Sequence, residues 1–165
     1  MEPIDSKIHN QLKKNLPFVV YSKPNSEEIT GFFQHNDTLF EVNDFTEKGF
    51  VVATFDGVKT YLIPESESEL VHFYLNSNEI AFSEKELSKA DKSAQNDFES
   101  LVSKGIQAIK NEKFQKVVLS RTEAVAIDDF DMVETFQKLV LLYPSAFVYC
   151  FYHPKIGNWI GATPE

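Results

Sequence analysis

The chain has 165 residues, of which 42% are hydrophobic and 25% charged, and its formal net charge at pH 7 is −9. At about 150 residues per domain this length predicts a single domain, and the composition excludes a wholly disordered chain. Because an acidic surface repels phosphate groups, we expect neither a nucleic-acid partner nor a membrane partner.

The single cysteine, Cys150, excludes a disulfide within the chain and a cysteine-based zinc site. It lies in the apolar run Phe147–Tyr152, so we expect a buried and inert thiol. The N-terminal residues Met1–Asn15 mix charges with few apolar side chains and match neither a signal peptide nor a transit peptide. No apolar run approaches the ~18 residues of a membrane span, so we expect a soluble, cytoplasmic protein.

A short polar helix is predicted over residues 6–15, ending before Pro17. β-Branched and aromatic runs then predict a series of strands, at Phe18–Lys23, Ile29–Gln34, Leu39–Val42, Gly49–Phe55 and Lys59–Ile63. Asp56-Gly57, between the last two strands, is a strong hairpin signal. Residues 1–64 are therefore expected to form a β-rich, antiparallel lead-in.

Residues 65–92 carry many mixed charges and few apolar side chains, which predicts a polar, solvated connection with at most one short helix. From Ser93 onward the apolar residues recur at helical spacing, at Phe98, Leu101, Val102, Gly105, Ile106 and Ile109. Either Asp91 or Ser93 can cap this helix. Gly105 lies on the apolar face, where the missing side chain allows a neighbouring segment to approach closely.

The last part of the chain, residues 93–165, combines helices with strands. The β-branched content of Lys116–Arg121 predicts a strand, and a second helix follows it, capped by Asp128 or Asp129. Two further strands are predicted at Ala146–Tyr152 and Asn158–Ala162. This order of elements predicts an α+β fold in which helices pack on a mostly antiparallel sheet.

Several polar residues are candidates for chemistry, and for each one a structural role competes. Lys116 begins an apolar strand, where a lysine is usually an edge charge. Arg121, the only arginine, is expected to form a salt bridge with a nearby carboxylate. No histidine has metal-ligand spacing with another ligand, and all are expected on the surface. They are His9, His35, His72 and His153.

The segment Gly161–Glu165 is the other candidate, because it leaves a strand through small residues and a proline that fixes φ before a carboxylate. Small residues allow a ligand ring to approach the backbone, and a fixed glutamate suits general acid catalysis. The same pattern is also typical of an ordinary turn.

Two segments in this order, Lys116–Arg121 (KVVLSR) and Trp159–Glu165 (WIGATPE), with Tyr143–Phe147 between them, resemble the chorismate-utilising enzymes. Within that family the chain is most similar to the isochorismate synthases. Further matching residues lie in the lead-in, at Leu16–Phe18, Tyr21–Pro24, Ile29–Gln34 and Gly49-Phe50. The resemblance covers most of the chain, although the polar connection contributes little to it.

This resemblance implies an architecture, a substrate and a catalytic pair. The fold would be the first part of the α/β sandwich of a chorismate-binding enzyme, with the catalytic core beginning in residues 93–165. In the water-using branch of the family, the lysine at the position of Lys116 is the general base that activates water for addition to C2 of chorismate. The glutamate at the position of Glu165 is the general acid that protonates the departing C4 hydroxyl. Gly161, Ala162 and Thr163 would contact the substrate.

The resemblance also implies a magnesium ion whose ligands lie beyond residue 165, so residues 1–165 would be the N-terminal part of a single domain. We therefore expect this chain alone not to turn over chorismate, and to self-associate through uncovered sheet surface. Isochorismate would then enter menaquinone or siderophore biosynthesis.

Other assignments stay open on the sequence. Salicylate synthase also carries the base lysine and remains an alternative. The ammonia-using anthranilate and aminodeoxychorismate synthases need no water-activating lysine, so Lys116 argues against them. A non-catalytic, β-rich binding domain is the alternative from another class of protein.

Overall fold

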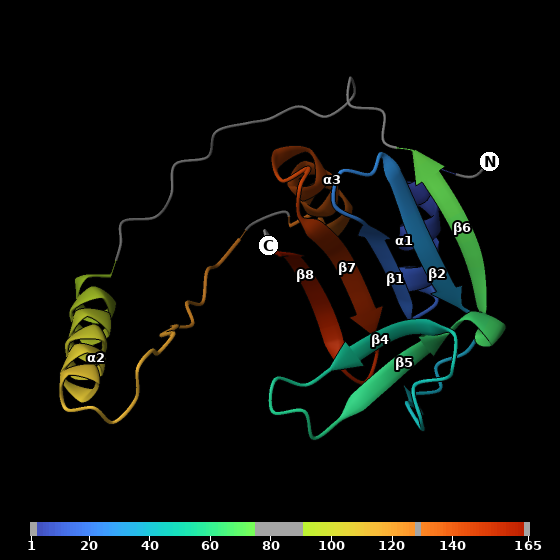
Figure 1. Cartoon of the computed structure of the whole chain (residues 1–165). Helices are drawn as coiled ribbons and strands as arrows, with labels where there is room; N and C mark the ends of the chain where they lie inside the picture. Colours follow the sequence, from blue (N-terminus) through green and yellow to red (C-terminus); the bar gives the residue numbers. More distant parts are fainter. Residues whose placement is uncertain (1–2, 75–90, 128–129, 164–165) are drawn as a thin grey trace. The chain divides into compact units, whose positions relative to one another are not determined.

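A computed structural model describes residues 3–74, 91–127 and 130–163 (Figure 1). The chain forms two compact units, one made of Met1–Phe82 together with Asp131–Glu165 and the other of Ser83–Phe130. No helix within the described ranges is long and apolar enough to cross a membrane.

The first unit is built on a five-stranded antiparallel sheet with the strand order β6-β2-β1-β7-β8. We refer to it as the main sheet. Its strands are β1 (Phe18–Ser22), β2 (Glu28–Gln34), β6 (Ser68–Tyr74), β7 (Phe147–His153) and β8 (Gly157–Thr163). Since β1 pairs with both β2 and β7, the sheet joins the beginning and the end of the chain.

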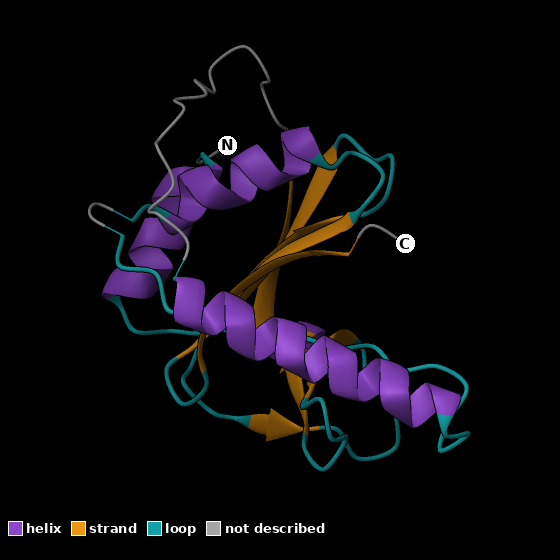
Figure 2. Ribbon diagram, turned by 90° about the vertical axis from the view of Figure 1, so that its left-hand side faces the viewer, coloured by secondary structure: helices purple, strands orange, loops and turns teal. Residues whose placement is uncertain are grey.

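Two helices, α1 (Ile4–Lys13) and α3 (Met132–Leu142), cover one face of the main sheet (Figure 2). Both turn apolar side chains toward the sheet, and Ile8 and Phe136 are fully buried there. Strand alternation supplies the other half of this core. Its sheet residues are Phe18, Val20, Ile29, Phe33, Phe73, Val148 and Cys150.

The opposite face packs against a three-stranded sheet with the order β3-β5-β4, formed by β3 (Phe40–Glu41), β4 (Gly49–Ala53) and β5 (Thr60–Pro64). The buried residues between the two sheets are Val19, Phe32, Ile63 and Phe151. The predicted hairpin is confirmed, because β4 and β5 pair antiparallel on either side of Gly57, whose φ is +69°. The predicted α+β fold class is confirmed as well.

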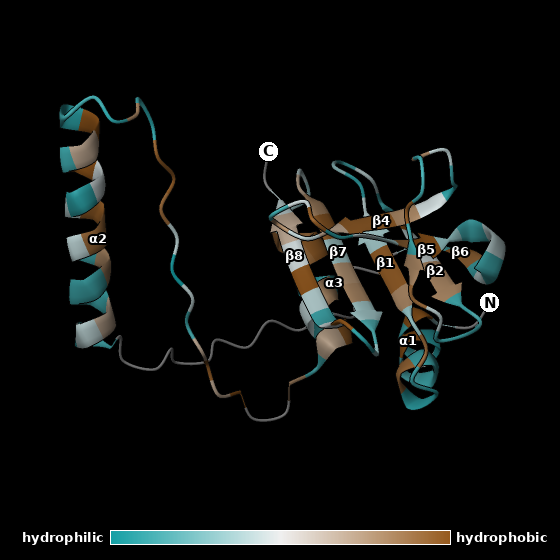
Figure 3. Ribbon diagram, turned by 90° about the horizontal axis from the view of Figure 1, so that it is seen from below, coloured by the Kyte–Doolittle hydropathy of each residue, from teal (hydrophilic) through white to brown (hydrophobic). Residues whose placement is uncertain are grey.

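The second unit contains α2 (Lys92–Lys110), whose N-cap is Asp91, one of the two predicted caps. Its carboxylate accepts a hydrogen bond from the Ser93 N–H at 2.8 Å. Apolar and polar residues alternate around this helix (Figure 3). Gly105 faces the segment that follows the helix, where an added Cβ would lie 3.1 Å from a Leu119 methyl group. The predicted close approach at Gly105 is therefore confirmed, and its partner is the neighbouring chain.

The predicted strand Lys116–Arg121 is wrong, because these residues are extended but belong to no strand in the described part of the chain. A strand requires a neighbouring chain for its backbone hydrogen bonds, and β-branched composition alone does not supply one. Val118 is accordingly 82% exposed, although its side chain is strongly apolar.

The predicted polar connection contains a strand that the prediction missed. After a short 3-10 turn, η1 (Glu65–Glu67), β6 forms an edge of the main sheet, and its Glu69 forms an ion pair with Lys7 of α1 at 2.6 Å. Leu70–Tyr74 has the β-branched and aromatic composition of a strand, and the charged residues around it hid this short run. The rest of the predicted connection, residues 75–90, lies outside the described residues.

The N-cap of α3 is Asp131, whose carboxylate accepts hydrogen bonds from the backbone N–H groups of Val133 at 2.8 Å and Glu134 at 3.0 Å. The predicted caps, Asp128 and Asp129, were therefore wrong; both lie outside the described residues. Asp131 immediately precedes the first turn of α3, which is the position from which a side chain reaches these N–H groups.

We expect Asp131→Ala to lower the free energy of unfolding by about 1 kcal/mol, because two N–H groups of α3 lose their acceptor. Asp131→Asn keeps the acceptor oxygen and should retain most of that stability. Urea unfolding of the two variants measures the difference, and equal losses in both would argue against a capping role for this side chain.

Candidate functional site

The hairpin of β7 and β8 carries the motif residues that the structure describes. Gly161 lies opposite Tyr149, Ala162 opposite Val148 and Thr163 opposite Phe147. Because side chains alternate along a strand, Gly161 and Thr163 share the face that the small sheet partly covers, whereas Ala162 packs into the core under the helices. The structure thus brings these three predicted substrate-binding residues together on one strand.

The phenol ring of Tyr149 lies directly over Gly161. A Cβ added at Gly161 would be 2.7 Å from both the hydroxyl oxygen and Cε1 of Tyr149, closer than real Cβ contacts come. A larger residue at position 161 would therefore displace the phenol from this position. A ligand that approaches this face of the motif meets the phenol before it meets the glycine backbone.

Aromatic side chains surround that contact. Tyr149 packs beside Phe147 with ring centroids 6.3 Å apart, and Phe147 in turn contacts Tyr21 at 5.5 Å and Phe50 at 6.4 Å. Trp159, the only tryptophan of the chain, is on the same face of β8 two residues before Gly161 and is 57% exposed. We call these five residues (Tyr21, Phe50, Phe147, Tyr149 and Trp159) the aromatic face.

At the end of β8, the hydroxyl of Thr163 donates a hydrogen bond to the carbonyl oxygen of Phe147 at 3.3 Å. The proline and glutamate of the motif follow at once, and both Pro164 and Glu165 lie outside the described residues. The role predicted for Glu165 therefore stays a prediction.

Lys116 belongs to the other compact unit and is an exposed residue of the extended segment after α2. In the same segment, the guanidinium of Arg121 forms an ion pair with Glu123, so the predicted salt bridge of the only arginine is confirmed. Arg121 also lines a cavity of about 480 Å³ together with Asp97 and Phe98 of α2. No ion pair or hydrogen bond of the Lys116 side chain is found among the described residues, and its role as a base stays a prediction.

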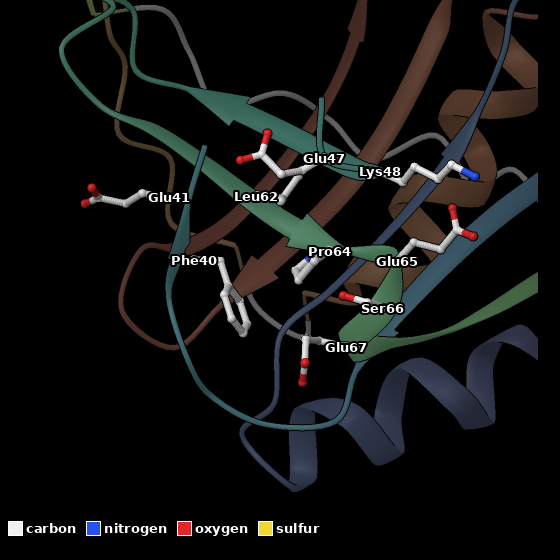
Figure 4. Close-up of a pocket in the computed structure, with 9 residues that line it drawn as sticks. All are labelled: Phe40, Glu41, Glu47, Lys48, Leu62, Pro64, Glu65, Ser66 and Glu67. Carbon is white, nitrogen blue, oxygen red and sulfur yellow. The ribbon is translucent and has the colours of Figure 1, made fainter. Parts of the chain in front are cut away.

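A further cavity, of about 590 Å³, lies on the small sheet and η1 (Figure 4). Its apolar lining comes from Phe40, Leu62 and Pro64, and its carboxylates belong to Glu41, Glu47, Glu65 and Glu67. Lys48 is the only cation among the residues that line it. Chorismate carries two carboxylates, and like charges brought together cost several kcal/mol, so this cavity is unsuited to that substrate.

Cys150 has no exposed surface, and burial raises the pKa of its thiol to about 12. The thiolate is the nucleophilic form of cysteine, so the thiol is unreactive near neutral pH. The predicted buried, inert cysteine is confirmed.

The prediction of surface histidines is wrong for His153, which is only 1% exposed, while His9, His35 and His72 are exposed as predicted. The loop after β2 covers His153, and Nε2 lies 3.4 Å from the carbonyl oxygen of Thr38. Nδ1 accepts a hydrogen bond from the backbone N–H of Lys155 at 3.1 Å, which fixes the turn between β7 and β8. A residue in a turn is usually exposed. His153 is buried because the loop after β2, which is distant in sequence, packs over it.

Burial lowers the pKa of His153 below its ordinary value of 6.5, and the nearby Lys155 charge acts in the same direction. The folded state therefore favours the neutral imidazole, and the unfolded state binds the proton more readily. We expect the free energy of unfolding to be constant above about pH 7 and to fall between pH 7 and pH 5, as the unfolded state gains that proton.

Urea unfolding across this pH range measures the dependence. His153→Gln should flatten it, because glutamine has no titratable group. An equal slope in His153→Gln and the unsubstituted protein would assign the pH dependence to other groups.

Among the described residues, no group of three or more His, Cys, Asp or Glu side chains is placed to hold a metal ion. Magnesium prefers carboxylate oxygens in near-octahedral geometry, and these parts of the chain do not fit that requirement. No step of the chemistry below is therefore derived through a metal.

A family model described as chorismate binding enzyme matches residues 35–165. The match includes both motif segments and extends over well more than half of the chain, so the chain belongs to the chorismate binding enzyme family. Comparisons with curated proteins and with solved structures gave no significant match. Family membership supports a chorismate-utilising enzyme, and the aromatic face is the described surface whose chemistry suits a ring-shaped substrate.

Proposed function

We propose that this chain supplies the catalytic base and acid of an isochorismate synthase, which isomerises chorismate to isochorismate. The observation that carries the proposal is the family match over residues 35–165, which includes the lysine and the glutamate of the two motifs in one chain. A water-using enzyme needs the lysine at position 116, whereas an ammonia-using relative does not.

In the proposed reaction, the neutral amine of Lys116 removes a proton from a water molecule, whose oxygen bonds to C2 of chorismate. The ring double bonds shift, and the C4 hydroxyl departs as water after Glu165 gives it a proton. One water enters and one leaves, so the reaction is an isomerisation. Lys116 must be in its neutral form when it takes the proton from water.

A magnesium ion, which the resemblance implies, would stabilise the negative charge of the substrate carboxylates when bound. We propose that its ligands lie outside residues 1–165, and that the described residues contribute the ring-facing side of the site. Under this proposal the 165-residue polypeptide alone does not turn over chorismate, and it functions within a cytoplasmic enzyme of menaquinone or siderophore biosynthesis.

Product analysis tests the proposal. The product of the complete reading frame that contains residues 1–165 is incubated with chorismate and Mg²⁺, and the products are separated by chromatography. Isochorismate keeps the pyruvyl ether and carries a hydroxyl at C2, whereas salicylate has lost pyruvate. Isochorismate as the end product supports the proposal, salicylate supports the second candidate, and unchanged chorismate supports a non-catalytic binding domain.

Salicylate synthase is the second candidate because it shares the base lysine, and Lys116 is therefore consistent with either enzyme. A salicylate synthase must also remove pyruvate from isochorismate. Purified isochorismate added as substrate distinguishes the two enzymes, since only a salicylate synthase releases pyruvate from it.

We further propose that the 165-residue polypeptide self-associates through β8, which is an edge strand of the main sheet among the described residues and carries no charged side chain. An unpaired, uncharged edge is a template for pairing with another chain. Light scattering over a range of concentrations should show a mass that rises with concentration, and a constant monomer mass would contradict this.

A further inference from the structure

The hydroxyl group of Tyr149, a partly buried residue, has no hydrogen-bond partner among the described residues, and its oxygen lies over Gly161. The ring is held on one side by Gly161 of β8 and beside it by Phe147. Tyrosine hydroxyls in partly buried sites usually find a partner, because the ring is apolar and its oxygen is not. A hydroxyl donor that has no acceptor within the protein is available to bind a ligand.

The surroundings of this hydroxyl suit an anionic ring. No carboxylate belongs to the aromatic face, in contrast to the cavity on the small sheet, which four glutamates line. In a chain of net charge −9, a dianionic substrate binds best where local carboxylates are absent and neutral donors are present.

We propose that the phenol of Tyr149 binds the substrate of this enzyme by donating a hydrogen bond to an oxygen atom on a substituent of the substrate's ring. We propose also that packing against Gly161 orients the phenol. The inference rests on the proposed function and adds to it a substrate-binding residue outside the sequence motifs. Gly161 then acts through Tyr149, as a positioning residue.

The packing of Tyr149 against Gly161 is tested first, by unfolding the 165-residue polypeptide, and this test needs no enzyme assay. Gly161→Ala should lower the urea midpoint of unfolding, because its methyl group would overlap the phenol. In a Tyr149→Ala background the same substitution should cost less than half as much, since the overlapping ring is gone. An equal decrease of the urea midpoint in both backgrounds would overturn the inference, because Gly161 would then not position Tyr149.

The hydrogen bond is tested by steady-state kinetics on the product of the complete reading frame, with chorismate as substrate. Tyr149→Phe keeps the ring and removes only the hydroxyl, so KM should rise about 10-fold, as expected for a hydrogen bond to a charged group, with kcat within about 2-fold. Tyr152→Phe is the control on the opposite face of the same strand. Its hydroxyl donates a hydrogen bond to the side chain of Asn15, so the urea midpoint of this variant is measured beside its KM.

The outcomes separate the inference from the proposed function. Turnover with an unchanged KM in Tyr149→Phe overturns the inference and leaves the isochorismate synthase proposal standing. A similar KM increase in Tyr152→Phe also overturns it, because the effect would then not be specific to the aromatic face. If the unsubstituted enzyme does not turn over chorismate, both the proposed function and the inference are wrong. This holds even if Gly161→Ala costs less stability in the Tyr149→Ala background.

Discussion

Lys116→Ala is expected to abolish water addition to chorismate and to leave the fold intact. The side chain belongs to neither core cluster and is exposed, so its removal leaves no cavity and no buried group without a partner. A positioned general base contributes about 10²–10⁴-fold to a rate, and the loss in kcat should fall in that range. Isochorismate formation by the product of the complete reading frame is the measurement, with circular dichroism to verify folding.

Two further variants make this result specific. Lys116→Arg keeps the positive charge but cannot provide a neutral base, because arginine stays protonated, so it should be as inactive as alanine. Lys113→Ala removes a nearby exposed lysine and should have normal activity. Activity within a few-fold of normal in Lys116→Ala would mean that the lysine is only an exposed surface charge, and full activity in Lys116→Arg would assign it an electrostatic role.

The second large effect is expected from Glu165→Gln, which removes the proton donor while it keeps the shape and hydrogen bonding of the side chain. Without a general acid the C4 hydroxyl must leave unprotonated, and the rate should drop by about 10²–10⁴-fold with little change in stability. The pH profile of the remaining activity should also lose the limb that reports the carboxylic acid.

Glu41→Gln is the matched control for this variant, because it neutralises an exposed carboxylate of the acidic cavity. It should leave both kcat and the pH profile unchanged. A normal rate in Glu165→Gln would show that the terminal glutamate of the motif is only a turn residue, and a loss of activity in Glu41→Gln would move the site to the acidic cavity.

Local patterns predicted most of the first unit. The strands β1, β2, β4 and β5 were predicted to within two residues at each end, because their apolar side chains recur at strand spacing and Asp56-Gly57 closes the hairpin between the last two. The predictions failed where a neighbour distant in sequence decides the outcome. Lys116–Arg121 has strand composition but no pairing partner in the described chain. β6 was missed for another reason, because its apolar run Leu70–Tyr74 is short and lies within a charged stretch, although it pairs with β2.

The candidate site follows the same division. The sequence placed Gly161, Ala162 and Thr163 at the end of a strand, and β8 confirms that placement. Tyr149 could not be found in this way, because its contact with Gly161 depends on the register of two antiparallel strands. The sequence shows only that Tyr149 precedes Gly161 in the neighbouring predicted strand. This identifies the two as partners only once the turn at His153–Gly157, which sets the register, is known.

The central position of β1 has a consequence for how the chain acquires its structure during synthesis. Its Phe18 lies opposite Tyr152, so the middle of the main sheet joins segments that are far apart in the sequence. Pairings this distant in sequence slow folding, since the intervening chain must be closed into a loop first. The hairpin of β1 and β2 therefore has an unpaired edge on β2 until β6 is synthesised and an unpaired edge on β1 until β7 is synthesised, which exposes the nascent chain to wrong strand pairing.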